Sequence, residues 1–120
     1  MNSKSAFFAR RFAKFAADTI RLTEGLKKYH RYEIINQITR SSVSIGANFS
    51  ESISARSRKE LISISEIALK EARETEYLLG IIDNLNLLSH NEVGRLRKES
   101  DEIIRILVAS INKNKKELSN

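Results

Sequence analysis

The sequence predicts an all-α protein, an antiparallel up-down-up-down four-helix bundle in which residues 1–120 form a single domain. The chain contains no Pro and only four Gly, so it has few of the tight turns that a β-sandwich or barrel needs. Apolar residues recur every three or four positions in four successive segments, as on the buried faces of helices. Short connections between these segments favour antiparallel neighbours.

The first expected helix, residues 5–30, has one apolar side and one cationic side. Its apolar seam consists of Phe8, Phe12, Phe15, Thr19, Leu22, Leu26 and Tyr29. The opposite side carries Arg10, Lys14, Arg21 and Lys28. We expect Phe7, Phe8, Phe12 and Phe15 to lie in the core, or to seal the start of this helix against a second subunit, rather than to stack on nucleic-acid bases.

The second expected helix, residues 32–55, combines an apolar seam with many small residues. The seam consists of Ile34, Ile38, Ser42, Ile45, Phe49 and Ile53. Small residues lower helix propensity but let a neighbouring helix approach closely. Another face carries Gln37, Arg40, Ser44, Asn48 and Glu51. We interpret this polar cluster as a hydrogen-bond network that fixes the helix against the third helix or a neighbouring subunit, the alternative being a small anion bound at Arg40.

Capping-box spacings mark the starts of the last two expected helices, residues 58–88 and 90–112. Ser57 lies three residues before Glu60, and Ser89 lies three residues before Glu92. The third helix has its apolar residues at Leu61, Ile64, Ile67, Ala68, Ala72, Leu78, Leu79, Ile82 and Leu85. The fourth has Val93, Leu96, Ile103, Ile106 or Leu107, and Ile111. The polar tail, residues 113–120, is expected to fray.

The net charge of +6 is concentrated in residues 1–31, which hold eight Lys and Arg against two acidic residues. The expected topology also gathers Lys4, the cations of the turn before the third helix and those of the tail at one end of the bundle. Cations alone suffice to contact phosphates, so the sequence predicts a nucleic-acid-binding surface. Its candidate residues are Arg10, Arg11, Lys14, Arg21, Lys28, Arg56, Arg58, Lys59, Lys113, Lys115 and Lys116. The alternative is that these cations only solvate exposed helix faces.

The sequence offers no catalytic constellation, so we expect no enzymatic activity, no metal and no cofactor. The absence of Cys excludes disulfides, thiolate nucleophiles and cysteine-ligated zinc. His30 and His90 fall in turns expected at one end, where they could form a metal site with Glu33 or Glu92, although turn histidines are more often solvated. With no signal peptide and no apolar run of about 18 residues, we expect a cytoplasmic protein that does not cross a membrane.

Three ordered motifs resemble a known family. They are RSSVSIGAN at residues 40–48 followed by Glu51, SRKE at residues 57–60, and IALKEARETEY at residues 67–77. Together they resemble the bacterial four helix bundle protein family, also called the 23S ribosomal RNA intervening-sequence protein or S23 family, over about residues 12–107. In that family Arg40, Asn48 and Glu51 correspond to polar positions of the second helix. Phe49, Ser52 and Leu78 depart from its commonest residues.

The resemblance implies an up-down four-helix bundle that assembles as a ring-shaped homopentamer and has a basic surface proposed to contact RNA or DNA. No enzymatic activity is established for the family. In a related group, the accessory variability determinants of diversity-generating retroelements, this surface is proposed to contact a reverse transcriptase as well. We therefore expect a non-enzymatic, oligomeric RNA- or DNA-binding scaffold. The alternative is a protein-interaction adaptor, for example for a reverse transcriptase or other polymerase, with no direct nucleic-acid contact.

Overall fold

The computed structural model describes residues 2–120, which form four α-helices and one short 3₁₀ helix. Helix α1 spans Ser3–Thr23 and continues as η1, Glu24–Tyr29. The other helices are α2, Tyr32–Ile53; α3, Arg58–Leu85; and α4, His90–Ser119. No strand occurs within residues 2–120, so the predicted all-α class is confirmed. None of the helices in this range is long and apolar enough to cross a membrane.

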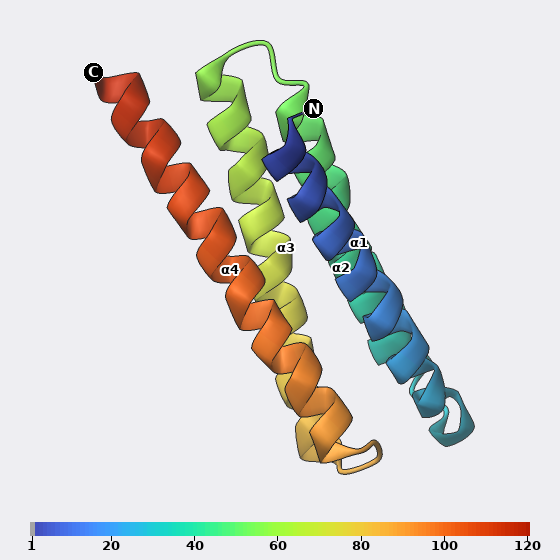
Figure 1. The fold of residues 1–120 in the computed structure, drawn as a ribbon. Coiled ribbons are helices and arrows are strands. Elements are labelled where there is room, and N and C mark those ends of the chain that lie inside the picture. Colours follow the sequence, from blue (N-terminus) through green and yellow to red (C-terminus); the bar gives the residue numbers. More distant parts are fainter. Residues whose placement is uncertain (1) are drawn as a thin grey trace.

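The helices form an elongated bundle with extents of 52 × 24 × 19 Å. Each helix packs against the next in the chain, and α4 also packs against α1. In Figure 1 every helix runs back along its predecessor. This arrangement is consistent with the antiparallel order that the short connections predicted.

The connections fall at two distinct ends of the bundle (Figure 1). We call the end with both termini and the loop at residues 54–57 the terminal end. We call the other end, with η1, the turn into α2 and the loop at residues 86–89, the turn end. The two termini and the α2–α3 loop therefore lie at the same end of the bundle, as the sequence predicted.

The core follows most of the predicted seams. On α1, Phe12, Phe15 and Thr19 are buried, and Leu26 of η1 is buried with them. The other fully enclosed large side chains include Ile38, Ile45, Leu79, Ile82, Val93, Ile103 and Leu107. One prediction for α3 is wrong, because Ile62 is buried whereas Ile67 is 48% exposed. The buried face at the start of α3 is thus rotated from the expected one.

Both predicted N-caps are present. Ser57 Oγ accepts the backbone N–H of Glu60 at 3.1 Å, and Ser89 Oγ accepts that of Glu92 at 3.3 Å. Each bond satisfies one backbone donor that a helix start leaves without a partner.

Two expected boundaries are wrong. The α-helical part of the first helix ends at Thr23, and η1 leaves Tyr29 38% exposed instead of continuing the buried seam. Residues 113–120 are not a frayed tail, because α4 continues to Ser119. Arg58 supports this last part of α4 by donating to Asn114 Oδ1 and Glu117 Oε2, both at 2.5 Å.

Candidate nucleic-acid interface

The cationic side of α1 is exposed and is partly neutralised by one carboxylate. Lys14 Nζ lies 2.7 Å from Asp18 Oδ2, and Arg21 Nη2 lies 2.6 Å from Asp18 Oδ1. The hydrogen bond from Lys14 and the one from Arg21 lower the pKa of Asp18 against the opposing effect of burial. Arg10 is exposed and has no ion pair within residues 2–120. This side of α1 therefore carries one unpaired guanidinium and two cations that share a carboxylate.

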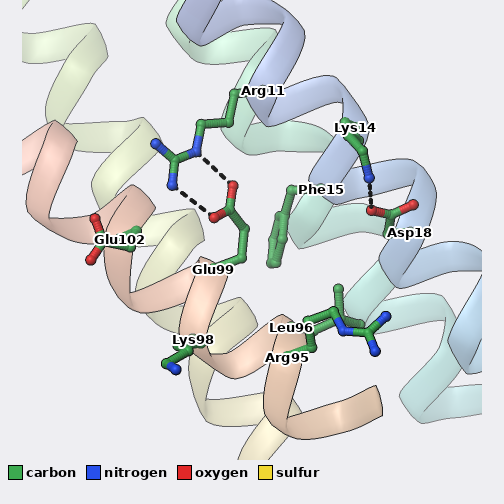
Figure 2. Close-up of a pocket in the computed structure, with 9 residues that line it drawn as sticks. All are labelled: Arg11, Lys14, Phe15, Asp18, Arg95, Leu96, Lys98, Glu99 and Glu102. Atoms are coloured by element: carbon green, nitrogen blue, oxygen red, sulfur yellow. Dashed lines mark hydrogen bonds and ion pairs between the residues drawn. The ribbon is translucent and has the colours of Figure 1, made fainter. Parts of the chain in front are cut away.

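Arg11 lies on a different side of α1 and connects it to α4 (Figure 2). Its Nε and Nη2 atoms donate to the two carboxylate oxygens of Glu99 at 2.7 and 2.8 Å. This bidentate bond raises the pKa of Arg11 above its ordinary value. The pair lies across a groove of about 490 Å³ that Phe15 and Leu96 also line. The guanidinium of Arg11 already holds α1 and α4 together, and its role in nucleic-acid binding stays a prediction.

The terminal end contains both paired and unpaired cations. Besides Arg58, Lys115 is paired there, with its Nζ atom 3.2 Å from Glu66 Oε2. The ammonium of Lys4 lies 5.9 Å from the centroid of the Phe8 ring. The remaining candidates at this end are exposed and have no ion pair in the part of the chain that the structure describes: Arg56, Lys59, Lys113 and Lys116. These four side chains are free to contact phosphates.

The turn end holds a basic and aromatic segment in which Lys28 was the one residue predicted to bind nucleic acid. Residues 27–32 read KKYHRY, and all six are exposed. The missed signal was the direct alternation of cations with aromatic rings, which the helical periodicity of the first segment obscured. The structure places this segment outside the core, after the buried Leu26.

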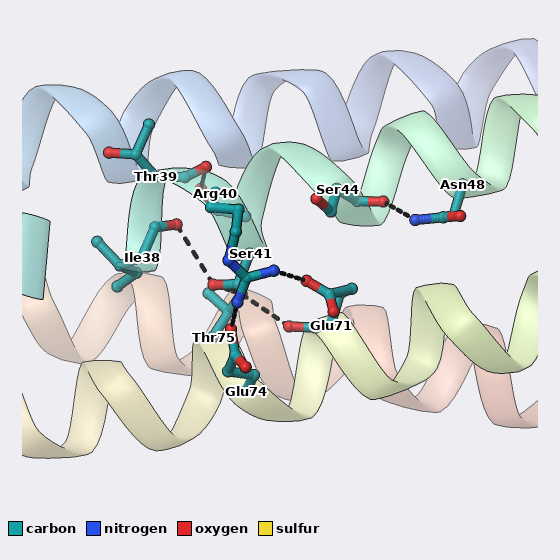
Figure 3. Close-up of polar contacts among 10 residues, drawn as sticks. Ile38, Thr39, Arg40, Ser41, Ser44, Asn48, Glu71, Glu74 and Thr75 are labelled. Carbon is teal, nitrogen blue, oxygen red and sulfur yellow. Dashed lines mark hydrogen bonds and ion pairs between the residues drawn. The ribbon is translucent and has the colours of Figure 1, made fainter. Parts of the chain in front are cut away.

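Within residues 2–120, Arg40 is the one member of the polar cluster of α2 that hydrogen-bonds to α3 (Figure 3). Arg40 Nη1 donates to Glu71 Oε2 at 2.8 Å, and its Nη2 bonds to Glu74. The hydrogen bond and charge of Glu71, followed by Glu74, raise the pKa of Arg40. Arg40 thus crosses to α3 as the structural interpretation predicted.

The other members of the cluster do not join a common network with Arg40. Gln37 Nε2 lies 3.4 Å from Glu33 Oε1, and Asn48 donates to the Ser44 carbonyl at 2.8 Å, both within α2. Glu51 is exposed. The expectation of one shared network is therefore wrong beyond Arg40.

A buried polar contact between α2 and α3 was missed (Figure 3). The Thr75 and Ser41 hydroxyls lie 2.8 Å apart, and both residues are fully buried. Thr75 also bonds to the Glu71 carbonyl at 2.9 Å. The sequence shows Ser41 only as one of many small residues of the second helix. The contact with Thr75 depends on the packing of α2 against α3, which the sequence pattern does not give.

The two histidines occupy separate settings. His30 adopts a left-handed conformation with φ 61° between η1 and α2. His90 Nδ1 lies 2.6 Å from Asp83 Oδ1, whose other oxygen is 3.2 Å from Arg97 Nη1. His90 first and then Arg97 lower the pKa of Asp83. Within residues 2–120 no group of three or more His, Cys, Asp or Glu side chains is placed to hold a metal ion.

Comparisons with known proteins identify similar sequences and structures. A family model described as 23S rRNA-intervening sequence protein matches residues 8–109. A crystal structure from Bacteroides thetaiotaomicron, described as a protein with unknown function from the S23 ribosomal protein family, is 33% identical to this chain. It superposes with a TM-score of 0.81, and the match covers 86% of this chain and 96% of that chain. No curated protein matches the chain.

Proposed function

Because this chain belongs to the family of 23S rRNA-intervening sequence proteins, we propose that it is a non-enzymatic, nucleic-acid-binding scaffold that acts as a homo-oligomer in the cytoplasm. The family description refers to an intervening sequence of 23S rRNA, so structured RNA is the first ligand to test. Duplex DNA is the second, since phosphate contacts do not distinguish the two.

The segregation of charge is the observation that carries this proposal. Residues 1–31 hold eight basic against two acidic residues, whereas residues 60–90 hold six acidic against two basic. The unpaired cations Arg10, Arg56 and Lys59 lie at exposed positions. A surface of this kind neutralises phosphates and releases counterions without any group that reads bases.

A shallow, uncharged groove between α1 and α2 supports assembly with further copies. It measures about 420 Å³ and is lined only by uncharged side chains, among them Ala13, Ala17, Val43 and Ala47. Small side chains let another helix approach closely, and removal of the apolar surface that lines most of this groove from water is favourable. We propose a ring of five, as the family resemblance implies. Five chains at +6 each would concentrate about +30 of charge in one particle, which strengthens phosphate binding.

Fluorescence anisotropy with a labelled RNA hairpin and duplex DNA tests the scaffold at a series of salt concentrations. The variant Arg56→Gln/Lys59→Gln removes two unpaired cations of the terminal end. Its matched control, Lys70→Gln/Arg73→Gln, removes two exposed cations of the acidic helix α3. The slope of log affinity against log salt should become shallower by about 1 for each phosphate that is no longer neutralised, in the first variant only. Equal effects of both variants, or binding that persists at high salt, would contradict phosphate contact at this end.

Exposed apolar side chains on α3 favour the adaptor as a second candidate. Ile67 is 48% exposed and Tyr77 70% exposed, on a helix rich in carboxylates. Tyr77 borders a groove of about 590 Å³ between α3 and α4. A protein such as a reverse transcriptase or other polymerase would be the partner.

Charge reversal on α1 separates the two candidates. Replacing Arg10, Lys14 and Arg21 by Glu should strongly weaken nucleic-acid binding by a scaffold. For an adaptor that uses α3, the same variant should keep its protein partner, while Ile67→Ser/Tyr77→Ser should lose it. Pull-down of a purified reverse transcriptase, compared between the two variants, provides the measurement.

A further inference from the structure

The segment at residues 27–32 alternates cations and aromatic rings on an exposed surface. Tyr29 is 38% exposed and Tyr32 52% exposed, and His30 is also exposed. The His30 and Tyr32 rings lie with centroids 6.0 Å apart at 57°. Lys28 Nζ lies 5.3 Å from the Tyr29 centroid and covers that ring from one side. No aromatic ring of this segment contributes to the core.

The backbone of this segment is fixed in spite of its exposure. Arg31 N–H donates to the Leu26 carbonyl at 3.3 Å, and His30 N–H donates to the Lys27 carbonyl at 3.0 Å. With His30 in the left-handed region, these two bonds form the Schellman arrangement that ends a helix. The rings are therefore presented on an ordered turn, which lowers the entropy cost of binding.

The preceding residues anchor this turn to the bundle. Leu26 is fully buried. At Gly25, a Cβ atom would lie only 2.9 Å from Leu88 Cδ2, so η1 packs closely against the α3–α4 loop. Residues 27–32 project from a fixed base.

The cations of this segment are unpaired. Lys27, Lys28 and Arg31 form no ion pair among residues 2–120, in contrast to Lys14 and Arg21 further back on α1. Unpaired cations next to exposed rings are the combination with which proteins bind single strands. The cations follow the phosphates, and unpaired bases stack on the rings.

From these observations we propose that the turn at residues 27–32 binds unpaired nucleotides, with bases stacked on Tyr29, His30 and Tyr32 and phosphates contacted by Lys27, Lys28 and Arg31. This site rests on the proposed function and deepens it, because it adds recognition of single-stranded segments to a surface that otherwise contacts only phosphates. A duplex keeps its bases stacked within the helix and cannot occupy the rings in this way.

Abasic strands separate stacking from charge. Anisotropy titrations would use the full chain, a labelled oligouridylate and an abasic strand of the same length, which has the same phosphates but no bases. The wild-type protein should bind the oligouridylate more tightly than the abasic strand. Oligodeoxyuridylate should show the same preference, and because it differs from oligouridylate only in the sugar, their relative affinity identifies RNA or DNA as the source.

The variant Tyr29→Leu/Tyr32→Leu removes both phenol rings and keeps apolar volume. It should lose at least about fivefold in oligouridylate affinity for each ring, which is the lower bound of base stacking on aromatic side chains. Affinity for the abasic strand should not change. Tyr77→Leu on α3 is the matched control and should bind as the wild type does, because Tyr77 is exposed but lies among carboxylates.

The variant His30→Gly provides a second test of base stacking in case Tyr29→Leu/Tyr32→Leu folds poorly. Glycine suits the left-handed conformation of residue 30 better than histidine does, so this variant should be at least as stable as the wild type. It should nevertheless bind oligouridylate more weakly.

Equal wild-type affinity for the oligouridylate and the abasic strand would overturn the site, as would an unchanged preference in the tyrosine variant. If the RNA hairpin still binds in those cases, the scaffold proposal survives while the nucleotide site does not. If no nucleic acid binds at all, both fail, and the exposed turn becomes a candidate protein contact.

Discussion

The two ends of the bundle contain the same kinds of residue and place them differently. At the terminal end, the Phe12 and Phe49 rings meet edge to face with centroids 5.0 Å apart, and Phe8 stacks on Phe12 at 6.2 Å. At the turn end, Tyr29 is 38% exposed and Tyr32 is 52% exposed. Three of the four rings at the start of the chain thus pack inward, whereas Phe7 is 53% exposed, and the expectation that it lies in the core is wrong; at the turn end neither tyrosine ring is buried.

Some cations show a similar contrast, although Arg56, Lys59, Lys113 and Lys116 of the terminal end are exposed and form no ion pair within residues 2–120. Arg58 and Lys115 of the terminal end bond to Glu117 and Glu66, which joins α3 to the last turns of α4. At the turn end, Lys27, Lys28 and Arg31 form no ion pair within residues 2–120, and Lys28 Nζ lies over the Tyr29 ring. The difference teaches that a neighbouring helix, not the residue type, decides whether a ring or cation is structural. Phe12 is buried against α2, and Arg58 bonds to α4. The side chains of residues 27–32 are exposed and bond to no other helix within residues 2–120.

The largest expected effect is a difference in the free energy of unfolding between two variants, each of which replaces one aromatic residue by alanine, one at each end of the bundle. Phe12→Ala should lower the free energy of unfolding by about 3–5 kcal/mol, because it opens a cavity in a fully buried cluster. Tyr32→Ala should change it by no more than about 0.5 kcal/mol, as expected for an exposed side chain. Urea unfolding followed by circular dichroism provides the measurement. Comparable losses for the two variants would contradict the assignment of the turn-end rings to the surface.

This contrast also shows how far the sequence determines the fold. Phe12, Phe15 and Leu26 were placed in the core correctly, because large apolar residues at helical spacing have few alternatives. Tyr29 was misplaced because residues 24–29 form a 3₁₀ helix, which turns about 120° per residue instead of about 100°. The error accumulates along η1 and carries Tyr29 out of the seam.

The candidate interface was predictable in charge but not in pairing. The sequence places Arg10 and Lys14 on one side of α1, and the structure agrees that both are exposed. The bond from Arg11 to Glu99 joins residues that are 88 positions apart, so it depends on how α4 packs against α1. Ser41 and Thr75 pose the same difficulty, since either hydroxyl could equally have faced water.

The cationic side of α1 lies between the two ends of the bundle. On this one helix, the effect of pairing a cation with a carboxylate can be tested directly. Asp18→Asn removes the carboxylate that Lys14 and Arg21 share, so both cations become unpaired like those of the turn end. Affinity for an RNA hairpin should rise by about two- to fivefold, in keeping with the strength of exposed ion pairs. The salt dependence should also become steeper. Unchanged affinity would mean that this side of α1 does not contact phosphates.

Loss of an ion pair at the terminal end should loosen the end of α4 without unfolding the protein. Arg58→Ala removes the bonds to Asn114 and Glu117 and should cost about 0.2–1 kcal/mol. Hydrogen exchange of the amides at residues 113–119 should accelerate. Lys27→Ala is the matched control, and it should leave exchange unchanged throughout the bundle because Lys27 has no such bond. Protection at residues 113–119 that survives Arg58→Ala would show that helix propensity alone maintains them.

The smallest expected effect is on the pH dependence of stability, and it arises beside the loop at residues 86–89 of the turn end. Asp83 has a pKa below its ordinary value of 3.8, owing first to the hydrogen bond from His90 and then to Arg97. A lowered carboxyl pKa stabilises the fold above the ordinary value, and this stabilisation is lost as the pH falls through the lowered one. The urea midpoint of the wild type should therefore exceed that of Asp83→Asn well above pH 3.8 and converge with it below.

The contacts of Asp83 predict how its pKa changes when His90 is removed, and they predict that loss of Asp83 leaves nucleotide binding unchanged. In His90→Ala the Asp83 carboxyl should titrate at higher pH, because the donor at 2.6 Å is gone while Arg97 remains, and carbon-detected NMR can follow this. Asp83→Asn should not alter oligouridylate binding, since residues 27–32 form no bond to Asp83. A parallel loss of binding would instead couple the two loops, and the turn could then no longer be treated as an independent site.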